Sequence, residues 1–390
     1  MHRAALGTAV VFTASGAVVG AWISRIPAVV ETLELTTGEL GRALLALGIG
    51  SLISMPVTGY ACRRLGSRTW VAATALVSAA ALTACGLATS VWTLSAALFV
   101  LGLSYGSWDV AMNVQGAYVD RQAAREWMPR YHACWSLGSI AGTAAGAAAA
   151  RFGTAVAPHL AIAALVSLTA AWTGLLSYLD ERTTPGVPQT TSAPSRRPTR
   201  AILTIGLITF CATVAEGAAG DWLALYLNTA RDFSQSAAAL AYTVFATAMT
   251  AGRFLGSTAV AYLGRATAVR GAAVLGLAGV TTTVLSPWPA LTYTGSLLWA
   301  VGICLVFPAA VSAAAETPNP AEAIAAVTAI GYGSILVGPP LIGALADRTG
   351  LAPALLLLAV LPTAIFALAP VLRPQPHPAQ TPTPTAGPGL

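Results

Sequence analysis

Apolar residues in this chain form long continuous runs, separated by short polar or turn-forming segments. A helix needs about 20 mostly apolar residues to cross the hydrocarbon core of a bilayer. Twelve runs approach or exceed that length. They cover residues 5–24, 40–60, 70–89, 92–117, 131–150, 156–179, 201–227, 237–260, 268–286, 289–313, 322–346 and 351–371. The pattern predicts an all-α membrane protein with twelve transmembrane helices.

Composition points the same way, because 56% of the residues are hydrophobic and only 9% are charged. Soluble domains carry about 25% charged residues, so we expect this chain to contact membrane lipid. The first apolar run lacks a small-residue cleavage site and is therefore expected to be a retained span.

The basic residues are all arginines, and they lie in short clusters between the apolar runs instead of forming one patch. This distribution argues against nucleic acid as a partner. The five cysteines show no metal-ligand spacing, so we expect neither a metal nor another cofactor. They are Cys62, Cys85, Cys134, Cys211 and Cys304.

Arginine placement also predicts the orientation. If the N-terminus is cytoplasmic, fourteen arginines fall in segments on that side, five fall on the other side, and Arg253 lies within a span. Short cytoplasmic loops are enriched in basic residues. The sequence therefore predicts a multi-pass protein of the bacterial plasma (inner) membrane with both termini in the cytoplasm.

The chain also repeats itself at the scale of half its length. The segment 146–153 that ends the fifth run matches the segment 343–350 that ends the eleventh at five of eight positions. Such repeats are typical of transporters built from two related halves. We expect four regions: an N-terminal six-helix bundle (1–179), a cytoplasmic linker rich in Pro, Ser, Thr and Arg (180–200), a C-terminal six-helix bundle (201–372) and a disordered cytoplasmic tail (373–390).

The loop after the second run reads Gly59-Tyr-Ala-Cys-Arg63-Arg64-Leu-Gly66-Ser-Arg68. It resembles the Gly-x-x-x-Asp-Arg-x-Gly-x-Arg loop that marks the major facilitator superfamily, except that Arg63 stands where the family has its acid. The resemblance implies two pseudo-symmetric six-helix bundles. It also implies a central cavity lined by helices one, four, seven and ten.

The fourth run reads Gly102-Leu-Ser-Tyr-Gly106-Ser-Trp-Asp109-Val-Ala-Met-Asn113. It is similar to the fucose-permease branch of the superfamily, in which an acid and an asparagine at these positions serve sugar recognition and proton coupling. That branch carries a further acid in its first helix, which is absent here. The first run instead contains Trp-Ile-Ser-Arg-Ile-Pro, and this combination also resembles a poorly characterised bacterial branch.

Ionisable residues within spans usually face a cavity or a partner. Asp109 and Asn113 are four residues apart and share one helix face, so Asp109 is the leading candidate for binding a proton or the solute. A structural hydrogen bond that packs the fourth helix is the alternative. His132 begins the fifth helix at a depth similar to Asn113, and it is either a proton relay or an interfacial histidine bonded to the backbone.

The seventh run holds Glu216 and Asp221, separated by Gly-Ala-Ala-Gly, which should loosen the helix. Arg253 in the eighth run needs a counter-charge, because an unpaired buried arginine is strongly disfavoured. We expect an ion pair between Arg253 and Glu216, as a structural contact or a gate. A second proton site at Glu216 is the alternative.

Trp22 and Arg25 are expected to end the first helix at the outer mouth. Trp22 is either an interfacial anchor or an aromatic wall for the solute. Arg25 either binds an anionic group or extends its side chain to the interface. Both residues are carried as candidate binding residues.

Together these features predict a monomeric secondary transporter for a small solute, coupled to protons and working by alternating access between two bundles. The first alternative is a proton-coupled efflux antiporter for a drug or metabolite. A receptor without transport activity is a second alternative, but no extra domain is available for signalling. We do not expect an enzyme, since no nucleophile elbow, paired metal ligands or phosphate loop is present.

Overall fold

The computed structural model describes residues 1–123, 127–180, 199–317 and 319–373, and within them the only regular elements are helices. In the first half these are α1 (His2–Leu33), α2 (Thr37–Leu65), α3 (Ser67–Gly86), α4 (Val91–Ala123), α5 (Met128–Arg151) and α6 (Val156–Leu175). Most of the expected linker and nearly all of the expected tail lie outside the described residues.

The second half begins with one rod made of α7 (Arg200–Ala218), a π-helical turn η2 (Ala219–Leu223) and α8 (Ala224–Ala230). It continues with α9 (Gln235–Leu263), α10 (Arg265–Leu285), α11 (Pro289–Ile303), α12 (Val306–Ala315) and α13 (Pro320–Thr349). The last rod combines α14 (Leu351–Leu356), η3 (Leu357–Ala359), α15 (Val360–Leu368) and η4 (Ala369–Leu372).

Ten helical segments of the described chain are long and apolar enough to cross a membrane, and α2 is an eleventh when its two parts are counted as one span. The remaining rod, α5, has 24 residues, so at about 1.5 Å per residue it is about 36 Å long. Its glycine and serine residues and its terminal arginine lower its mean hydropathy without shortening it. The all-α architecture with twelve passes is thus confirmed.

The helices extend beyond the apolar runs, and α1 corrects one prediction. Trp22 and Arg25 do not end the first helix, which continues to Leu33 with Pro27 inside it. Residues 20–29 are all buried, because this part of α1 packs against α5, α6, α8 and α9. Tertiary packing therefore sustains the helix past its arginine and proline.

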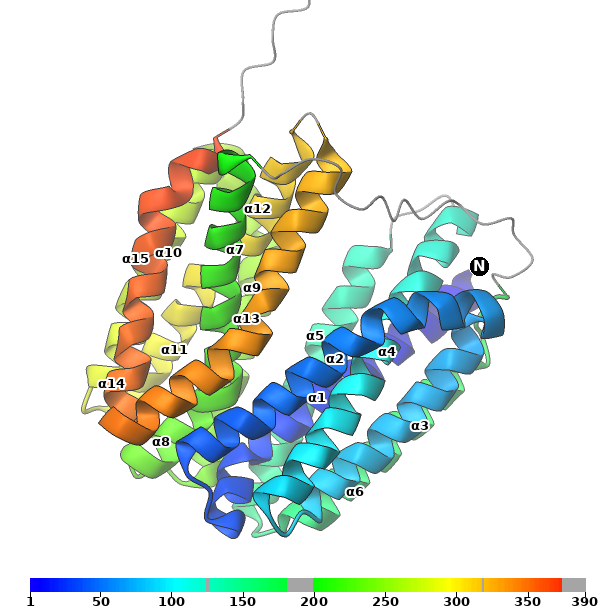
Figure 1. Ribbon diagram of the computed structural model, residues 1–390, viewed down its shortest axis with the longest axis horizontal. Coiled ribbons are helices and arrows are strands. Elements are labelled where there is room, and N and C mark those ends of the chain that lie inside the picture. The colour runs from blue at the N-terminus through cyan, green and yellow to red at the C-terminus, as the bar shows by residue number, and fades with distance from the viewer. Residues whose placement is uncertain (124–126, 181–198, 318, 374–390) are drawn as a thin grey trace, which may run out of the picture.

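The helices form two bundles, with α1–α6 in one and α7–η4 in the other (Figure 1). Within the first bundle, α1 packs on α5 and α2 packs on α4; across the two bundles, α2 contacts α13 and α5 contacts α9. The α1–α5 contact relies on glycine. A Cβ added to Gly138 would lie 2.0 Å from the backbone oxygen of Thr13, so only glycine permits this approach.

A glycine turn recurs after the second helix of every group of three. Gly66, Gly153, Gly264 and Gly350 have φ values of 83°, 68°, 76° and 85°, a region that glycine adopts without strain. They follow the second, fifth, eighth and eleventh passes. The regularity indicates four related three-helix units, two in each bundle, and extends the repeat seen in the sequence.

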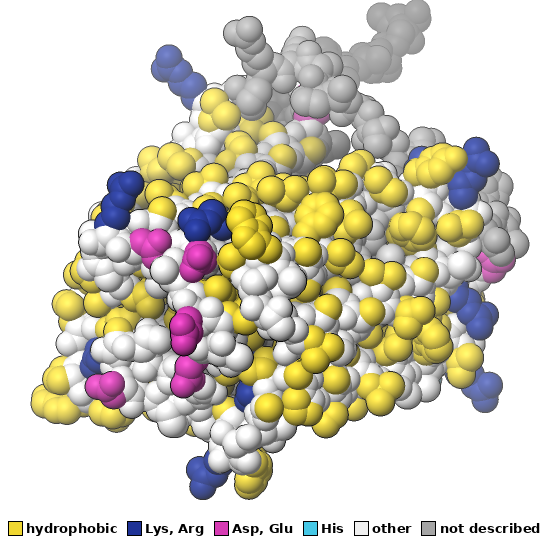
Figure 2. Space-filling model, turned by 60° about the horizontal axis from the view of Figure 1, so that its bottom comes forward, with side chains coloured by type: hydrophobic (Ala, Val, Ile, Leu, Met, Phe, Trp, Pro, Cys, Tyr) yellow, Lys and Arg dark blue, Asp and Glu magenta, His cyan; other side chains and the backbone are white. Residues whose placement is uncertain are grey.

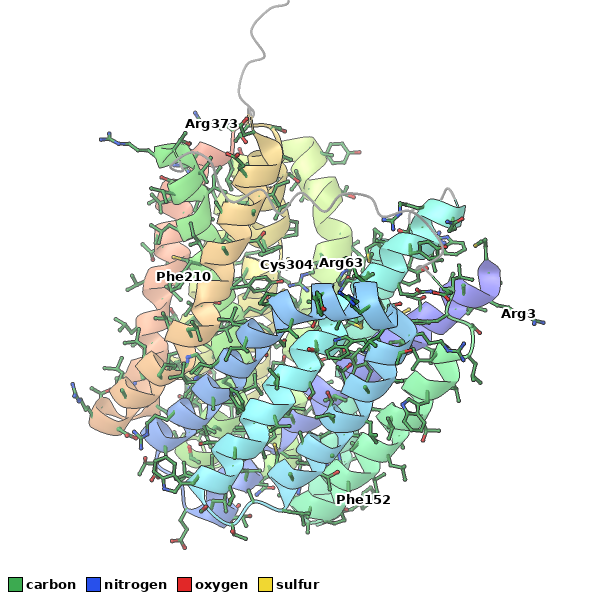
Figure 3. The ribbon with its side chains drawn as sticks, turned by 45° about the vertical axis from the view of Figure 1, so that its right-hand side comes forward. Arg3, Arg63, Phe152, Phe210, Cys304 and Arg373 are labelled. Atoms are coloured by element: carbon green, nitrogen blue, oxygen red, sulfur yellow. The ribbon has the colours of Figure 1, made fainter. Side chains whose placement is uncertain are left out.

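The surface facing the viewer in Figure 2 is largely apolar, with charged side chains in the minority. Leucine, valine and tryptophan side chains on α3, α6 and α10 are also exposed, and an apolar surface of this kind is suited to lipid contact. In Figure 3, Arg373 lies at the upper end of the second bundle, Arg3 at the right-hand end of the first bundle and Phe152 at the bottom. We call the ends of the two bundles that carry Arg3 and Arg373 the termini face, and the ends near Phe152 the opposite face.

Candidate functional site

A cavity of about 660 Å³ lies between the two bundles. Its walls are built by α4 and α5 on one side and by α7, α9 and α13 on the other. The lining residues are Tyr105, Asp109, Pro129, His132, Ala133, Trp135, Ser136, Thr213, Glu216, Thr250, Arg253, Phe254, Gly331, Tyr332, Ser334 and Ile335. They extend from the middle of these helices toward the termini face, because α5, α7 and α13 begin at that face and α4 and α9 end there.

Asp109 is the acid of the first wall. It projects from α4 into the cavity, and among the described residues no arginine or histidine nitrogen lies within 4 Å of its carboxylate. Asn113, one turn further along α4, donates its amide to the Asp109 backbone oxygen at 2.8 Å and does not line the cavity. On this shared helix face, the Asp109 carboxylate therefore lines the cavity, whereas the Asn113 side chain is bonded to the backbone of its own helix.

Tyr105 lies one turn before Asp109 and joins three helices. Its hydroxyl oxygen accepts a hydrogen bond from Trp135 Nε1 of α5 at 2.9 Å and one from Ser15 Oγ of α1 at 3.3 Å. These two bonds hold both aromatic rings beside Asp109. Tyr105 was not among the residues expected from the sequence, although its i,i+4 spacing to Asp109 was the signal that could have identified it.

His132 lines the same wall from α5. Its ring meets the ring of Phe12 edge-on, with centroids 5.4 Å apart, so α1 supports the imidazole from behind. The charge of Arg253, on the facing wall, acts on this imidazole.

The second wall carries an ion pair. Arg253 Nη2 of α9 lies 2.9 Å and 3.1 Å from the two carboxylate oxygens of Glu216 of α7. Both side chains line the cavity and remain partly exposed to it, at 37% and 42%. The structure thus contains the contact expected from the sequence, while its role as a structural pair or a gate stays a prediction.

The glycine-containing segment after Glu216 forms the π-helical turn η2. Such turns insert one extra residue into a helix and occur often at functional sites. Asp221 lies in this turn and does not line the cavity. Its neighbour Gly220 faces α1 and α9, where an added Cβ would be 3.4 Å from Ile23 and 3.7 Å from Tyr242.

Trp22 and Arg25 lie apart from the cavity, inside the first bundle. Trp22 is 4% exposed and Arg25 is 3% exposed, so neither forms an outer mouth. Arg25 Nη2 donates to the Thr154 backbone oxygen at 2.7 Å, which ties α1 to the turn between α5 and α6. In the described structure its Nε and Nη1 atoms have no hydrogen-bond partner, and neither ring nitrogen of the neighbouring His159 has one.

Comparison with known proteins defines the family. The model of the Major Facilitator Superfamily matches residues 4–331, and a second match covers residues 205–388. The chain belongs to the Major Facilitator Superfamily. It is therefore a membrane transporter for a small-molecule solute.

Three relatives resemble the chain over most of its length. An uncharacterized transporter, y4wD, of Sinorhizobium fredii (strain NBRC 101917 / NGR234) is 34% identical over 372 residues, covering 94% of this chain and 97% of the relative. An uncharacterized MFS-type transporter of Yersinia pestis is 32% identical over 352 residues, or 90% of each chain. Membrane protein MosC of Rhizobium meliloti is 29% identical over 347 residues, 88% of this chain and 84% of MosC.

Solved structures support the same fold. The nucleoside transporter NupG superposes with a TM-score of 0.73 at 15% identity, covering 94% of this chain and 98% of NupG. A bacterial homolog of the human lysosomal transporter Spinster, in an inward-facing and unoccupied conformation, gives a TM-score of 0.75 at 13% identity, covering 96% of this chain and 98% of the homolog. At these identities the likeness concerns the fold alone.

The cavity of this facilitator departs from the helix set that the family resemblance implied. α4 and α7 line it as expected, but α5, α9 and α13 supply the other lining side chains. α1 lies behind the wall and acts through Ser15 and Phe12, while helix ten, formed by α11 and α12, contributes no lining residue.

At the opposite face the two bundles are in contact. The Asp347 carboxylate at the end of α13 accepts hydrogen bonds from Thr37 Oγ1 at 2.6 Å and from the Gly38 backbone N–H at 2.7 Å, both at the start of α2. Gly41 and Gly343 allow the backbones to approach, since a Cβ on Gly343 would lie 3.2 Å from the Gly41 Cα. We call the Asp347 contact with Thr37 and Gly38 the α13–α2 latch.

The family loop lies at the other end of α2. Gly66 supplies the positive φ that the turn into α3 requires, and Arg63, Arg64 and Arg68 are exposed. The Arg64 guanidinium lies over the ring of Tyr60, 5.3 Å from its centroid. Counted back from the equivalent glycines Gly66 and Gly350, Arg63 occupies the position that Asp347 occupies in the latch.

Proposed function

We propose that this facilitator is a proton-coupled secondary transporter that moves a small solute through the cavity between its bundles. The observation that carries the proposal is the Asp109 carboxylate, which lines the cavity opposite the Arg253–Glu216 pair and has no cationic partner among the described residues. An ionisable group within a span is energetically costly, and such groups are usually functional. Proton binding at Asp109 would remove its charge when the cavity closes.

The proposed cycle is alternating access. The cavity reaches toward the termini face, while the α13–α2 latch and the Glu31–Gln235 hydrogen bond of 2.6 Å join the bundles at the opposite face. With both termini in the cytoplasm of a bacterium, as the arginine bias suggests, this is an inward-facing conformation. Rocking of the bundles would break the latch and open the cavity to the outside.

In this cycle Asp109 would bind the proton, and His132 would relay it between the cavity and the termini face. The Arg253–Glu216 pair would keep the second wall neutral. Asn113 and Asp221 would act within their helices, and Trp22 and Arg25 would hold the outer part of the first bundle. The protein would work as a monomer in the inner membrane.

The test is a solute screen with purified protein in proteoliposomes, with and without an imposed pH gradient. The proposal predicts that the pH gradient drives accumulation of at least one solute and that Asp109→Asn removes this dependence. Everted membrane vesicles then separate uptake from extrusion. Accumulation that ignores the pH gradient in every case would leave facilitated diffusion as the function.

A further inference from the structure

The charges on the cavity walls do not balance. Glu216 is neutralised by Arg253 at 2.9 Å, which leaves Asp109 as the lining carboxylate without a cationic partner in the described structure. His132 also lines the cavity, and Arg253 on the far wall acts on its imidazole. Among the described lining residues, an incoming solute therefore meets one carboxylate without a cationic partner, while the lining arginine is already paired with Glu216.

Aromatic rings surround that negative charge. Tyr105 and Tyr332 are both close enough for the Asp109 charge to act on their hydroxyls, one from the same helix and one from α13 of the other bundle. Trp135 is fixed beside Tyr105 by its 2.9 Å hydrogen bond, and Phe254 lines the facing wall. Aromatic faces next to a carboxylate are an arrangement that attracts organic cations.

Other solute classes fit these walls less well. An anion would face the free carboxylate and would have to break the Arg253–Glu216 pair to find a counter-charge. A neutral polyol would leave the Asp109 charge uncompensated in the closed cavity, which is strongly unfavourable, unless a proton bound with it. A cationic solute supplies the missing charge itself.

We infer that the transported solute carries a positively charged nitrogen, a small organic ammonium ion, and that Asp109 is its counter-ion. This inference rests on the cavity being the transport site, as proposed above. One carboxylate then serves either a proton or the ammonium group. Binding of the cation releases the proton, so the two ions are exchanged across the membrane. Asp109 binds the proton while the cavity crosses in one direction and the ammonium ion while it crosses in the other.

The experiment compares three probes of the same shape and different charge on the purified full-length protein. They are choline, its neutral carbon analogue 3,3-dimethylbutan-1-ol, and the anion 3,3-dimethylbutyrate. The readouts are the thermal midpoint of unfolding and the protons released into a weakly buffered solution. We expect choline alone to raise the midpoint and to release protons.

Variants assign the effect to the carboxylate. Asp109→Asn should weaken choline binding by about tenfold to a hundredfold, since loss of a charge-assisted contact worth 1.4 kcal/mol is about a tenfold change. Asp109→Glu should restore most of the response, which separates loss of charge from loss of folding. The control Asp232→Asn changes an exposed acid outside the cavity, at a positive φ of 55° that asparagine tolerates, and should respond like wild type.

An equal response to choline and its neutral analogue, or a response to neither, would overturn the inference, as would full choline binding by Asp109→Asn. These results are distinct from failure of proton coupling. If a pH gradient still drives a neutral solute through wild type but not through Asp109→Asn, the proposed function stands without the ammonium ion. If choline binds at Asp109 without proton release, the ammonium site stands without proton coupling.

Discussion

Removing the α13–α2 latch should shift the protein toward the conformation that is open at the opposite face. In Asp347→Ala the carboxylate that accepts from Thr37 Oγ1 and the Gly38 N–H is lost. This carboxylate also lies at the N-terminal end of α2, where negative charge is favoured. The latch joins the two bundles, so its hydrogen bonds stabilise only the conformation that is closed at this face.

The magnitude follows from two charge-assisted hydrogen bonds. Each would contribute about 1.5–3 kcal/mol if shielded from water, but Asp347 is exposed, and solvent reduces such contacts to about 1 kcal/mol or less each. We therefore expect about 1–2 kcal/mol in total, a factor of roughly 5–30 in the ratio of the two conformations. The replacement lies outside the cavity, so solute affinity within each conformation should be unchanged.

The assay is an electron–electron distance measurement between spin labels at Phe152 and Leu285, exposed ends of α5 and α10 at the opposite face. The five native cysteines are replaced in the background used for labelling. Asp347→Ala should add a population at longer distance, whereas the adjacent control Arg348→Ala should not. An unchanged distribution in Asp347→Ala would refute the latch as a stabilising contact between the bundles.

Three further substitutions test other parts of the structure by thermal unfolding in detergent. Arg253→Ala should destabilise the protein by about 1 kcal/mol because Glu216 loses its partner. The double variant Arg253→Ala with Glu216→Ala should recover part of that loss. Strictly additive effects of the two substitutions would mean that the pair is not coupled. Gly138→Ala should be severely destabilising because its Cβ would lie 2.0 Å from an α1 carbonyl oxygen. Gly217→Ala, with open space around it, should be neutral or stabilising by up to about 1 kcal/mol. Equal unfolding midpoints for the two variants would contradict the close packing of α1 on α5. Arg25→Met should leave the midpoint nearly unchanged, because loss of the hydrogen bond to Thr154 is offset by removal of a buried cation with two unpartnered nitrogens in the described structure. A large drop would mean that the Thr154 bond outweighs the cost of burying the charge.

The fold was predictable because the bilayer imposes a simple rule. A chain with so few charges must satisfy its backbone inside helices, and each apolar run of about 20 residues corresponds to one pass. The ends of the helices were harder to predict. α1 continues beyond Arg25 because neighbouring helices bury residues 20–29, and contacts of that kind are not visible in the periodicity of one segment.

The site was predictable to the extent that it depends on charge. Four of the candidate residues line the cavity: Asp109, His132, Glu216 and Arg253. Each was a candidate because an ionisable residue within a span usually has a function. The cavity-lining Tyr332 was not found, since a single tyrosine on a helix does not reveal which helix it will face.

The latch shows a further limit of the sequence. The segment that ends with Asp347-Arg348-Thr349-Gly350 was recognised as a repeat of segment 146–153. Its function depends on the start of α2, more than 300 residues away along the chain. Only the packing of α13 against α2 brings the carboxylate to Thr37 and Gly38 and turns a repeat into a contact between bundles.

Proton flux in proteoliposomes shows whether Asp109 couples the solute to protons. Wild-type protein and Asp109→Asn are compared with an internal pH indicator while a transported solute is added and the external pH is varied. We expect solute addition to move protons through wild type but not through Asp109→Asn, and the remaining solute flux of the variant to be independent of pH. Proton movement and pH dependence in Asp109→Asn equal to those of wild type would rule out coupling through Asp109.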